Sequence, residues 1–378
     1  MTEKPQARER RCGLSLVSWF EKNARDLPWR RGYDPYHVLV SEFMLQQTQI
    51  KTVLPYFDRW VARWPSLDSL SRAGEPEALK LWEGLGYYSR CRNLLKCAKA
   101  MRADGHEAPP PSVEALRSYP GIGPYTAGAV ASLAYNLPVP AVDGNAERVI
   151  SRVCDLTETG TALRRRVGEF VVRVLKVLPG APRAFNQGLM DLGSLVCSPT
   201  SPLCGDCPLS DLCLSLERGL TSQRPVPVPR REVQRSEAWG LLCLLEGKGK
   251  FLLRRRPEKG LWASMWELPW IERGDGGFEA DFRDWAAPLG LERLSCRMVG
   301  EASFSFTHHR VRARVVFCEV RMQSPYALPG EGWGVFQLDE LATLTLPAPS
   351  RKFLKAYHLW CKVSPFRRTG DRQKTNYP

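Results

Sequence analysis

Apolar residues recur with a helical period through the first two hundred residues, and prolines and glycines separate one periodic segment from the next. No convincing alternation of the kind expected for a half-buried strand interrupts them. The pattern predicts helices over 14–23, 35–46, 53–60, 77–82, 89–103, 113–119, 125–135, 145–154, 164–178 and 183–195. The first part of the chain is therefore expected to be all-α.

The pattern changes after residue 218. Residues 219–235 contain prolines alternating with valines and several arginines, which is typical of an extended basic linker. Beyond it, β-rich runs separated by turn signals cover 238–245, 250–254, 297–307 and 311–320. We therefore expect a helical region over 1–218, a linker over 219–235, a mixed α and β domain over 236–362 and a disordered polar tail over 363–378.

Length and charge narrow the class of protein. A chain of 378 residues is long enough for two domains with separate cores. Its 54 Lys and Arg against 40 Asp and Glu give a net charge of +14, which favours DNA or RNA as a partner, with an anionic membrane surface as the alternative. The chain has no apolar run of membrane-spanning length, no secretory signal and no transit peptide. These features predict a soluble protein of a bacterial cytoplasm, associated with the nucleoid.

Four cysteines, Cys197, Cys204, Cys207 and Cys213, form a C-x6-C-x2-C-x5-C cluster, and the prolines and glycine between them disfavour a regular helix. Four thiolates on one short loop can supply every ligand of a cubane iron–sulfur cluster or of a tetrahedral zinc ion. Ligand softness alone does not separate these two, and four unrelated reduced thiols are a third interpretation.

A Gly-x-Gly turn, Gly121 to Gly123, joins the helices predicted over 113–119 and 125–135. Glycine allows backbone geometry that larger residues cannot adopt, and the amides at the start of the next helix can then face a phosphate. Such a turn would hold the DNA backbone without reading its sequence. An ordinary connection between two helices is the alternative.

Two carboxylates are candidates for acid–base chemistry. Glu42 lies among apolar neighbours on a predicted helix, a setting that raises a carboxyl pKa and suits a general acid, although a solvated helix carboxylate is the alternative. Asp143 follows a short apolar segment and precedes a predicted helix, so helix capping and catalysis are equally consistent with its position.

Several separated segments carry a family resemblance. They are Leu27-Pro28-Trp29-Arg30, Ser41-Glu42 with Met44-Leu45-Gln46-Gln47-Thr48, Gly84-Leu85-Gly86-Tyr87-Tyr88-Ser89-Arg90, the Gly121 turn, Asp143-Gly144-Asn145, Phe185-Asn186-Gln187 and the cysteine loop. Together they resemble the adenine DNA glycosylases of the MutY type, which remove adenine mispaired with 8-oxoguanine. The resemblance implies a multidomain protein with an all-α helix-hairpin-helix glycosylase region and an iron–sulfur loop, followed by an α+β Nudix-like domain.

The resemblance also implies roles. Glu42 matches the general acid that protonates N7 of the extruded adenine, and Asp143 matches the carboxylate that faces the anomeric carbon, as cleavage of an N-glycosidic bond requires. Tyr125 and Asn145 match residues that position these carboxyls. The four cysteines would hold a 4Fe–4S cluster.

Further matches concern the flipped base. Gln47 and Tyr87 match side chains that fill or wedge the opened duplex. Trp29, Arg30 and Gln187 match the wall of the base pocket. Core packing is the alternative for Trp29 and Tyr87, and surface solvation is the alternative for Arg30 and Gln187.

Relatives that also nick DNA carry a lysine where this chain has Tyr125. Without that amine nucleophile, the expected product is an abasic site rather than a cut strand. An endonuclease III-like bifunctional glycosylase for pyrimidine lesions and a non-catalytic iron–sulfur DNA-binding protein are the alternatives.

The second domain resembles the Nudix-like domain of the same family over 251–257, 260–262 and 266–269. Residues 278–291 lack the R-E-x-x-E-E motif that holds Mg²⁺ in Nudix hydrolases, so pyrophosphate hydrolysis is not expected. Phe306, Thr307 and His308 match a loop that contacts 8-oxoguanine, although its middle residue is a serine elsewhere. Exposed loop histidines or a weak metal pair at His308 and His309 are alternatives. The expected partner is duplex DNA with an 8-oxoguanine:adenine or guanine:adenine pair, bound by a monomer.

Overall fold

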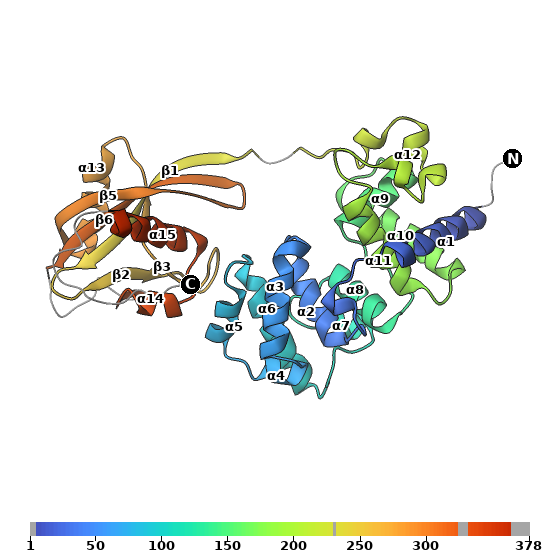
Figure 1. The fold of residues 1–378 in the computed structure, drawn as a ribbon, viewed down its shortest axis with the longest axis horizontal. Helices are drawn as coiled ribbons and strands as arrows, with labels where there is room; N and C mark the ends of the chain where they lie inside the picture. The colour runs from blue at the N-terminus through green and yellow to red at the C-terminus, as the bar shows by residue number, and fades with distance from the viewer. Residues whose placement is uncertain (1–4, 230–231, 324–331, 364–378) are drawn as a thin grey trace. The chain divides into compact units, whose positions relative to one another are not determined.

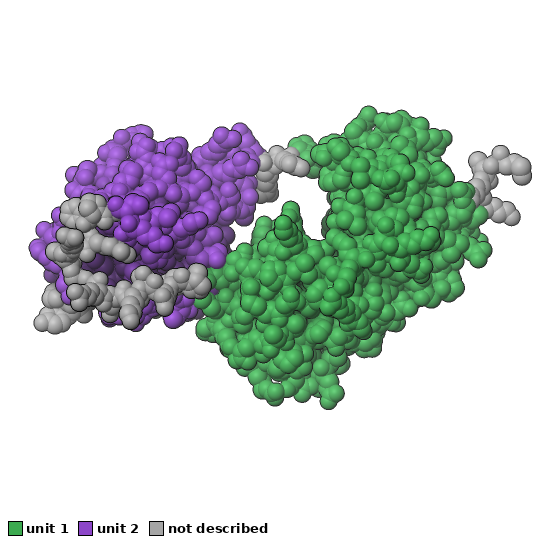
Figure 2. Space-filling model, in the orientation of Figure 1, with its two compact units in different colours: residues 1–229 green, residues 230–378 purple. Residues whose placement is uncertain are grey.

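The computed structural model describes residues 5–229, 232–323 and 332–363. It separates the chain into two compact units, Met1–Pro229 and Arg230–Pro378 (Figures 1 and 2). The boundary falls inside the span predicted as a linker. No helix in the described part of the chain is both long enough and apolar enough to cross a membrane.

The first unit is all-α, and the fold class predicted for it is confirmed. Its longer helices are α1 (Pro5–Asn23), α2 (Pro35–Leu45), α3 (Ile50–Arg63), α5 (Glu75–Trp82), α6 (Tyr88–Ala103), α8 (Pro124–Tyr135), α9 (Gly144–Val153), α10 (Gly160–Val177) and α11 (Pro182–Leu195). Shorter segments are η1 (Pro28–Arg30), α4 (Leu67–Ser71), α7 (Val113–Arg117), η2 (Cys204–Asp206), η3 (Ser210–Leu212), α12 (Leu214–Glu217) and η4 (Thr221–Gln223).

Two helix groups form this unit. In one, α2 packs against α3, α6 and α8; in the other, α1, α9, α10 and α11 enclose an apolar core. Helices α8 and α11 also contact each other and join the groups. The C-terminal end of α2 and the N-terminal ends of α8 and α9 therefore come from different parts of the sequence to one region of the unit.

Helix α1 starts at Pro5, nine residues before the predicted start at residue 14. The extra segment has few apolar residues, so its periodicity is weak. It is held by Arg8, whose Nη2 donates to the backbone oxygens of Val153 and Leu212, each at 2.9 Å. This long-range contact has no local signal. Helix α4, which the pattern did not predict, begins with a capping box between Ser66 and Ser69.

The second unit is built on a sheet with strand order β3-β2-β1-β6-β5; in addition, β4 pairs with β1 and β7 pairs with β2. The strands are β1 (Gln234–Leu245), β2 (Lys250–Arg255), β3 (Trp266–Glu267), β4 (Trp270–Glu272), β5 (Leu291–Phe306), β6 (His309–Met322) and β7 (Trp333–Phe336). Strands β1 and β6 are parallel, and β5 runs antiparallel to β6. The mixed α and β class predicted for this unit is confirmed.

Each face of this sheet has its own core. Helix α15 (Ala348–Val363) packs on one face through Phe353 and Ala356, and helix α13 (Gly277–Ala286) covers the other through Phe282 and Ala286. A short helix, α14 (Glu340–Thr343), and the turn η5 (Ala287–Leu289) complete the unit. Gln234 and Arg235, predicted as linker, belong to β1 because they pair with β6. Of the predicted tail, Val363 ends α15 and residues 364–378 lie outside the described residues.

Candidate functional site

A cleft of about 900 Å³ in the first unit collects most of the residues predicted to act on a base. Its walls come from η1, the end of α2, the loop before α3, the starts of α8 and α9, and the middle of α11. The predicted residues that line it are Trp29, Arg30, Glu42, Gln47, Tyr125, Asp143, Asn145 and Gln187. The fold therefore brings together residues that lie more than a hundred positions apart.

Glu42 lies on α2, a helix whose apolar side chains are buried on most sides. Its side chain is 4% exposed, and its Oε2 has no hydrogen-bond partner within the described residues. The pKa of Glu42 is raised to about 7, chiefly because burial disfavours the anion. The charge of Asp143 also raises the pKa, whereas the hydrogen bond with Tyr125 and the charge of Arg30 lower it. The alternative of a solvated carboxylate is wrong.

Asp143 is the N-cap of α9, and both of its oxygens are engaged. Oδ1 accepts from the backbone amide of Ala146 at 2.7 Å, and Oδ2 accepts from Nδ2 of Asn145 at 2.7 Å. Burial raises the pKa of Asp143 above its usual value, although these hydrogen bonds favour the anion. The carboxylate therefore caps the helix and lines the cleft at the same time.

Tyr125 lies in the first turn of α8 and adjoins both carboxylates. Burial and the charges of Glu42 and Asp143 raise the pKa of Tyr125, which keeps its hydroxyl protonated. A neutral phenol can donate one hydrogen bond to a carboxylate. Tyr125 forms a hydrogen bond with Glu42 and lies near Asp143, so the three groups form one interacting cluster.

The residues predicted to form the wall of the base pocket are held by contacts with other side chains. Trp29 is buried and meets the Phe57 ring edge-on at 5.1 Å. Arg30 forms a two-pronged ion pair with the buried Asp191, at 2.8 Å from Nη1 to Oδ2 and 2.9 Å from Nη2 to Oδ1. Gln187 is 2% exposed, and its Nε2 donates to the Tyr33 hydroxyl at 3.0 Å. Surface solvation is therefore wrong for Arg30 and Gln187.

Asp191 was not identified from the sequence. It also pairs with Arg25, so one buried carboxylate holds two arginines that line the cleft. The available signal was its place on α11, one turn after Gln187 and between the apolar positions Leu189 and Leu192. A charged residue in an apolar helical stripe is buried only when it is paired.

The two predicted wedge residues have left-handed backbones, with φ of 56° at Gln47 and 48° at Tyr87. Gln47 lines the cleft, whereas Tyr87 is 53% exposed and does not. The buried Arg90 braces both loops: Nη1 donates to the backbone oxygens of Met44, at 2.8 Å, and Gln46, and Nη2 donates to that of Leu85 at 3.1 Å. Core packing is therefore wrong for Tyr87.

The structure requires glycine at only one of the two glycine positions of the Gly-x-Gly turn. Gly121 has φ of 80°, and an added Cβ would come within 2.6 Å of Asn93 Cβ and 2.9 Å of Phe43 Cε1. Gly123 is the N-cap of α8 with φ of −83°, a conformation open to any residue, and nothing lies within 4 Å of a Cβ there. The expectation of special backbone geometry thus holds for Gly121 and is wrong for Gly123. The open space beside Gly123 adjoins the first amides of α8.

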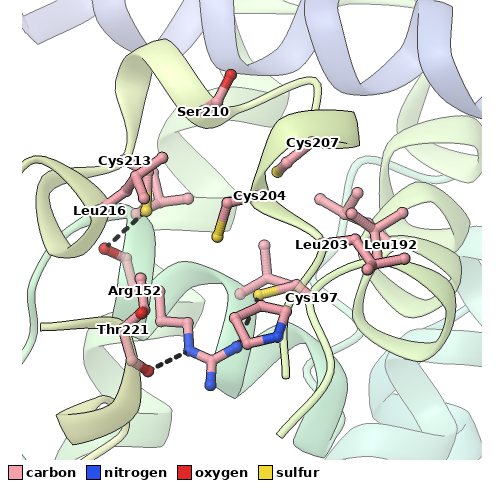
Figure 3. Close-up of a pocket in the computed structure, with 14 residues that line it drawn as sticks. Arg152, Leu192, Cys197, Leu203, Cys204, Cys207, Ser210, Cys213, Leu216 and Thr221 are labelled. Carbon is pink, nitrogen blue, oxygen red and sulfur yellow. Dashed lines mark hydrogen bonds between the residues drawn. The ribbon is translucent and has the colours of Figure 1, made fainter. Parts of the chain in front are cut away.

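The four clustered cysteines line one hollow, and Figure 3 shows their sulfur atoms facing a common space. The loop contains two 3-10 turns, η2 and η3, instead of a regular helix. Among the described residues, no three His, Cys, Asp or Glu side chains lie close enough together to hold a single metal ion. A hollow bordered by four thiols has the donor set that an iron–sulfur cluster requires.

Helix α9 fastens this loop and connects it to the cleft. The buried Arg152 donates from Nη1 to Cys197 Sγ at 3.2 Å and to the Ser198 oxygen at 2.7 Å. One turn earlier, Arg148 donates from Nε to the Cys197 oxygen at 2.8 Å and from Nη2 to Asn145 Oδ1 at 2.8 Å. Since Asn145 binds Asp143, a continuous hydrogen-bonded path joins the cysteine loop to a cleft carboxylate.

In the second unit, Thr307 and His308 form the turn between β5 and β6, and Thr307 has φ of 46°. Phe306 packs edge-on against Trp262 at 5.5 Å and stacks on His309 at 5.0 Å. No metal-binding group of three side chains occurs at this turn or elsewhere in the described parts of the chain.

Two carboxylates of α13 bind side chains of the sheet. Glu279 forms an ion pair with Arg293, and Asp281 Oδ2 accepts from Trp239 Nε1 at 2.8 Å. These contacts tie α13 to the sheet, as structural side chains do.

Three family models match parts of this chain. Residues 40–171 match the HhH-GPD superfamily of base excision DNA repair proteins, residues 197–213 match the iron–sulfur binding domain of endonuclease III, and residues 240–356 match the NUDIX domain. The rat protein named adenine DNA glycosylase is 31% identical over 403 residues, covering 91% of this chain and 77% of the relative. The protein of that name from Mycolicibacterium smegmatis is 42% identical over 198 residues, covering 52% of this chain and 67% of the relative.

Among solved structures, a thermostable thymine-DNA glycosylase is 26% identical and superimposes with a TM-score of 0.51, covering 57% of this chain and all of that one. The superimposed part of the chain is about as long as the first unit.

Proposed function

Because this chain belongs to the adenine DNA glycosylases, we propose that it excises adenine opposite 8-oxoguanine or guanine in duplex DNA and leaves an abasic site. The observation that carries this proposal is the convergence of Glu42, Tyr125 and Asp143 in one cleft. We further propose that it acts as a monomer, on the nucleoid DNA of a bacterial cytoplasm.

Glu42 is the proposed acid. A carboxyl group with a pKa of about 7 holds its proton near neutral pH and can transfer that proton to N7 of adenine. Protonation makes the base a better leaving group. The partnerless Oε2 supports this role, because a buried oxygen without a partner is available to a bound base.

Asp143 is proposed to face the sugar. As the bond to adenine breaks, positive charge develops on the anomeric carbon, and a fixed carboxylate stabilises it directly or through a transient covalent bond. Asn145 and the Ala146 amide keep this carboxylate in one orientation. Tyr125 is proposed to position both acids.

The base pocket and the opened duplex involve other residues. Trp29, Arg30 and Gln187 are proposed to form the wall against the flipped adenine, with Arg30 held by Asp191. Gln47 and Tyr87 are proposed to occupy or wedge the gap in the duplex, which an exposed aromatic ring suits. Gly121 and Gly123 are proposed to present the start of α8 to a phosphate.

The cofactor is a 4Fe–4S cluster. We propose Cys197, Cys204, Cys207 and Cys213 as its ligands, since all four line one hollow. When bound, the cluster supplies a structural centre that fixes the path of this loop. The second unit is the proposed lesion reader, with Phe306, Thr307 and His308 contacting 8-oxoguanine.

The absence of a lysine at Tyr125 supports an abasic product. Lys51 is the only lysine that lines the cleft among the described residues, and it lies exposed at the start of α3. Lys51 therefore lies on a different helix from Tyr125, the position at which the nicking relatives carry their lysine.

The test is a single-turnover reaction on duplexes that hold one 8-oxoguanine:adenine or guanine:adenine pair, with half of each sample heated in alkali. Strand cleavage chiefly after alkali is expected. Cleavage without alkali would contradict the abasic product and direct attention to Lys51→Ala. Tight binding without base loss on either duplex would contradict adenine excision itself, and a guanine:thymine duplex serves as the substrate control.

A further inference from the structure

One face of the second unit carries a row of arginines near the turn that joins β5 and β6. Side chains alternate along β6, and Val311, Ala313 and Val315 enter the core beneath α15. The residues between them therefore occupy the opposite face, which α13 covers only at its far end. Arg310, Arg312 and Arg314 lie on this face of β6, and Arg235 is the register partner of Arg310 on β1. Arg273 joins them through its ion pair with Glu237 of β1. We call these five residues the arginine face.

Arg235 and Arg310 are register partners on the adjacent strands β1 and β6. Both are exposed, and neither side chain makes an ion pair or hydrogen bond within the described residues. Like charges placed opposite each other on neighbouring strands repel. The fold thus places two arginines without an ionic partner among the described residues at register positions of adjacent strands, where an external anion would relieve the repulsion.

The acids on this face do not neutralise that pair. Glu237 forms an ion pair with Arg273, and Glu301 forms one with Arg312 at 2.8 Å. The face therefore keeps an excess of positive charge at the end that adjoins the β5–β6 turn.

Two arginines of the face, Arg273 and Arg314, also lie against an aromatic ring. The guanidinium carbons of Arg273 and Arg314 lie 5.6 Å and 5.8 Å from the centre of the buried Trp239 ring. Stacking on an aromatic face leaves the edge of a guanidinium free to donate. On β5, the exposed Ser303 and Ser305 are register partners of Arg312 and Arg310 and add hydroxyl donors to the same face.

We propose that the arginine face binds the sugar–phosphate backbone of duplex DNA beside the β5–β6 turn. This inference rests on the proposed function, since it assumes a DNA substrate. Guanidinium groups and hydroxyls are the donors that most often contact phosphate oxygens, and such contacts fix position without reading sequence. A membrane surface fits less well because the aromatic ring on this face, Trp239, is buried beneath the arginines.

The test compares the full-length protein with Arg235→Ala/Arg310→Ala. The probe is a duplex with 8-oxoguanine opposite a carbocyclic adenine analogue that cannot be excised, and the dissociation constant is measured between 50 and 200 mM salt. Each phosphate contact contributes about 0.9 to the slope of log affinity against log salt concentration, so the double variant should lower that slope by about 1.8. Single-turnover excision at saturating protein should be unchanged.

Two further variants make the result specific. Arg283→Ala/Arg321→Ala removes the same charge from exposed positions away from the face and should leave the slope as in the parent protein. Arg235→Lys/Arg310→Lys keeps the charge and should keep the slope.

An unchanged slope in the double alanine variant would overturn the inference, and so would an equal fall in the distant pair. A fall in the lysine variant equal to that of the alanine variant would also overturn it, because the loss would then follow packing instead of charge. If the parent protein excised no adenine, the proposed function would fail instead, so the two failures are distinguishable.

Discussion

Replacing Glu42 by Gln should change activity and stability in opposite directions. The amide has almost the same shape as the carboxyl group but can neither ionise nor deliver a proton. Glu42 is almost completely buried, and its pKa rises from 4.5 to about 7. A group whose folded-state pKa is raised contributes most to stability below its unfolded pKa, and that contribution is lost as the pH rises towards the folded pKa.

The size of both effects follows from this shift. At pH 8.5 the ionised Glu42 should destabilise the folded protein by about 3 kcal/mol, whereas at pH 5 the cost is under about 1 kcal/mol. Glu42→Gln should therefore be more stable than the parent protein at pH 8.5 by about 3 kcal/mol and differ little at pH 5. Loss of general acid catalysis should lower the excision rate by about 10²–10⁴-fold.

Urea unfolding followed by tryptophan fluorescence at the two pH values measures stability, and single-turnover excision measures activity. The parent rate should itself fall about 90-fold between pH 6 and pH 9, as the fraction of protonated acid falls. Glu21→Gln, an exposed position on α1, is the matched control and should change neither quantity. A variant that loses activity without gaining stability at pH 8.5 would refute the link between burial and catalysis.

The remaining predictions concern other parts of the cleft and the second unit. Asp143→Asn should keep the cap of α9, since Asn is an equally good N-cap, yet lose at least 10²-fold in excision rate; an excision rate close to that of the parent protein would contradict a role beyond capping. Asp191→Asn should cost about 3–5 kcal/mol in urea unfolding by leaving two arginines unpaired, with partial recovery in Asp191→Glu. Gly121→Ala should destabilise the turn, whereas Gly123→Ala should fold normally and weaken duplex binding; equal effects would contradict the different roles of the two glycines. A chain ending at Pro229 should still excise adenine but lose its preference for 8-oxoguanine over guanine opposite; equal preference in both forms would contradict the lesion-reading role of the second unit.

Periodicity and motif spacing were sufficient to predict the long helices and the change to a sheet, because these depend on local pattern. Long-range contacts had no such signal. The N-terminal half of α1 is held by Arg8 against Val153 and Leu212, and neither contact leaves a trace in the local sequence. For the same reason Asp191, which fixes Arg30, was not identified.

The solvent exposure of several site residues could not be predicted from their residue type. Arg30 and Gln187 are polar residues, and their sequence environment is compatible with solvent exposure. A hydrogen bond to Tyr33 accompanies the burial of Gln187, and the ion pair with Asp191 holds the half-buried Arg30 in the cleft wall. Tyr87 shows the converse, since an aromatic residue in a motif suggests a core position. A left-handed backbone and the Arg90 brace leave its ring exposed.

Asp143 shows why a structural interpretation and a catalytic one need not compete. A helix N-cap places a carboxylate at a helix terminus where backbone amides and the helix dipole favour the anion. Here one oxygen accepts from the Ala146 amide and the other from Asn145, so the capping geometry itself fixes the orientation of the group in the cleft. Burial acts against these bonds and raises the pKa of Asp143, so the anion is held in place without being fully stabilised. In the proposed mechanism, a carboxylate in that state gains more from a developing positive charge than a solvated one would, so the same cap geometry serves the catalytic role that we propose for Asp143.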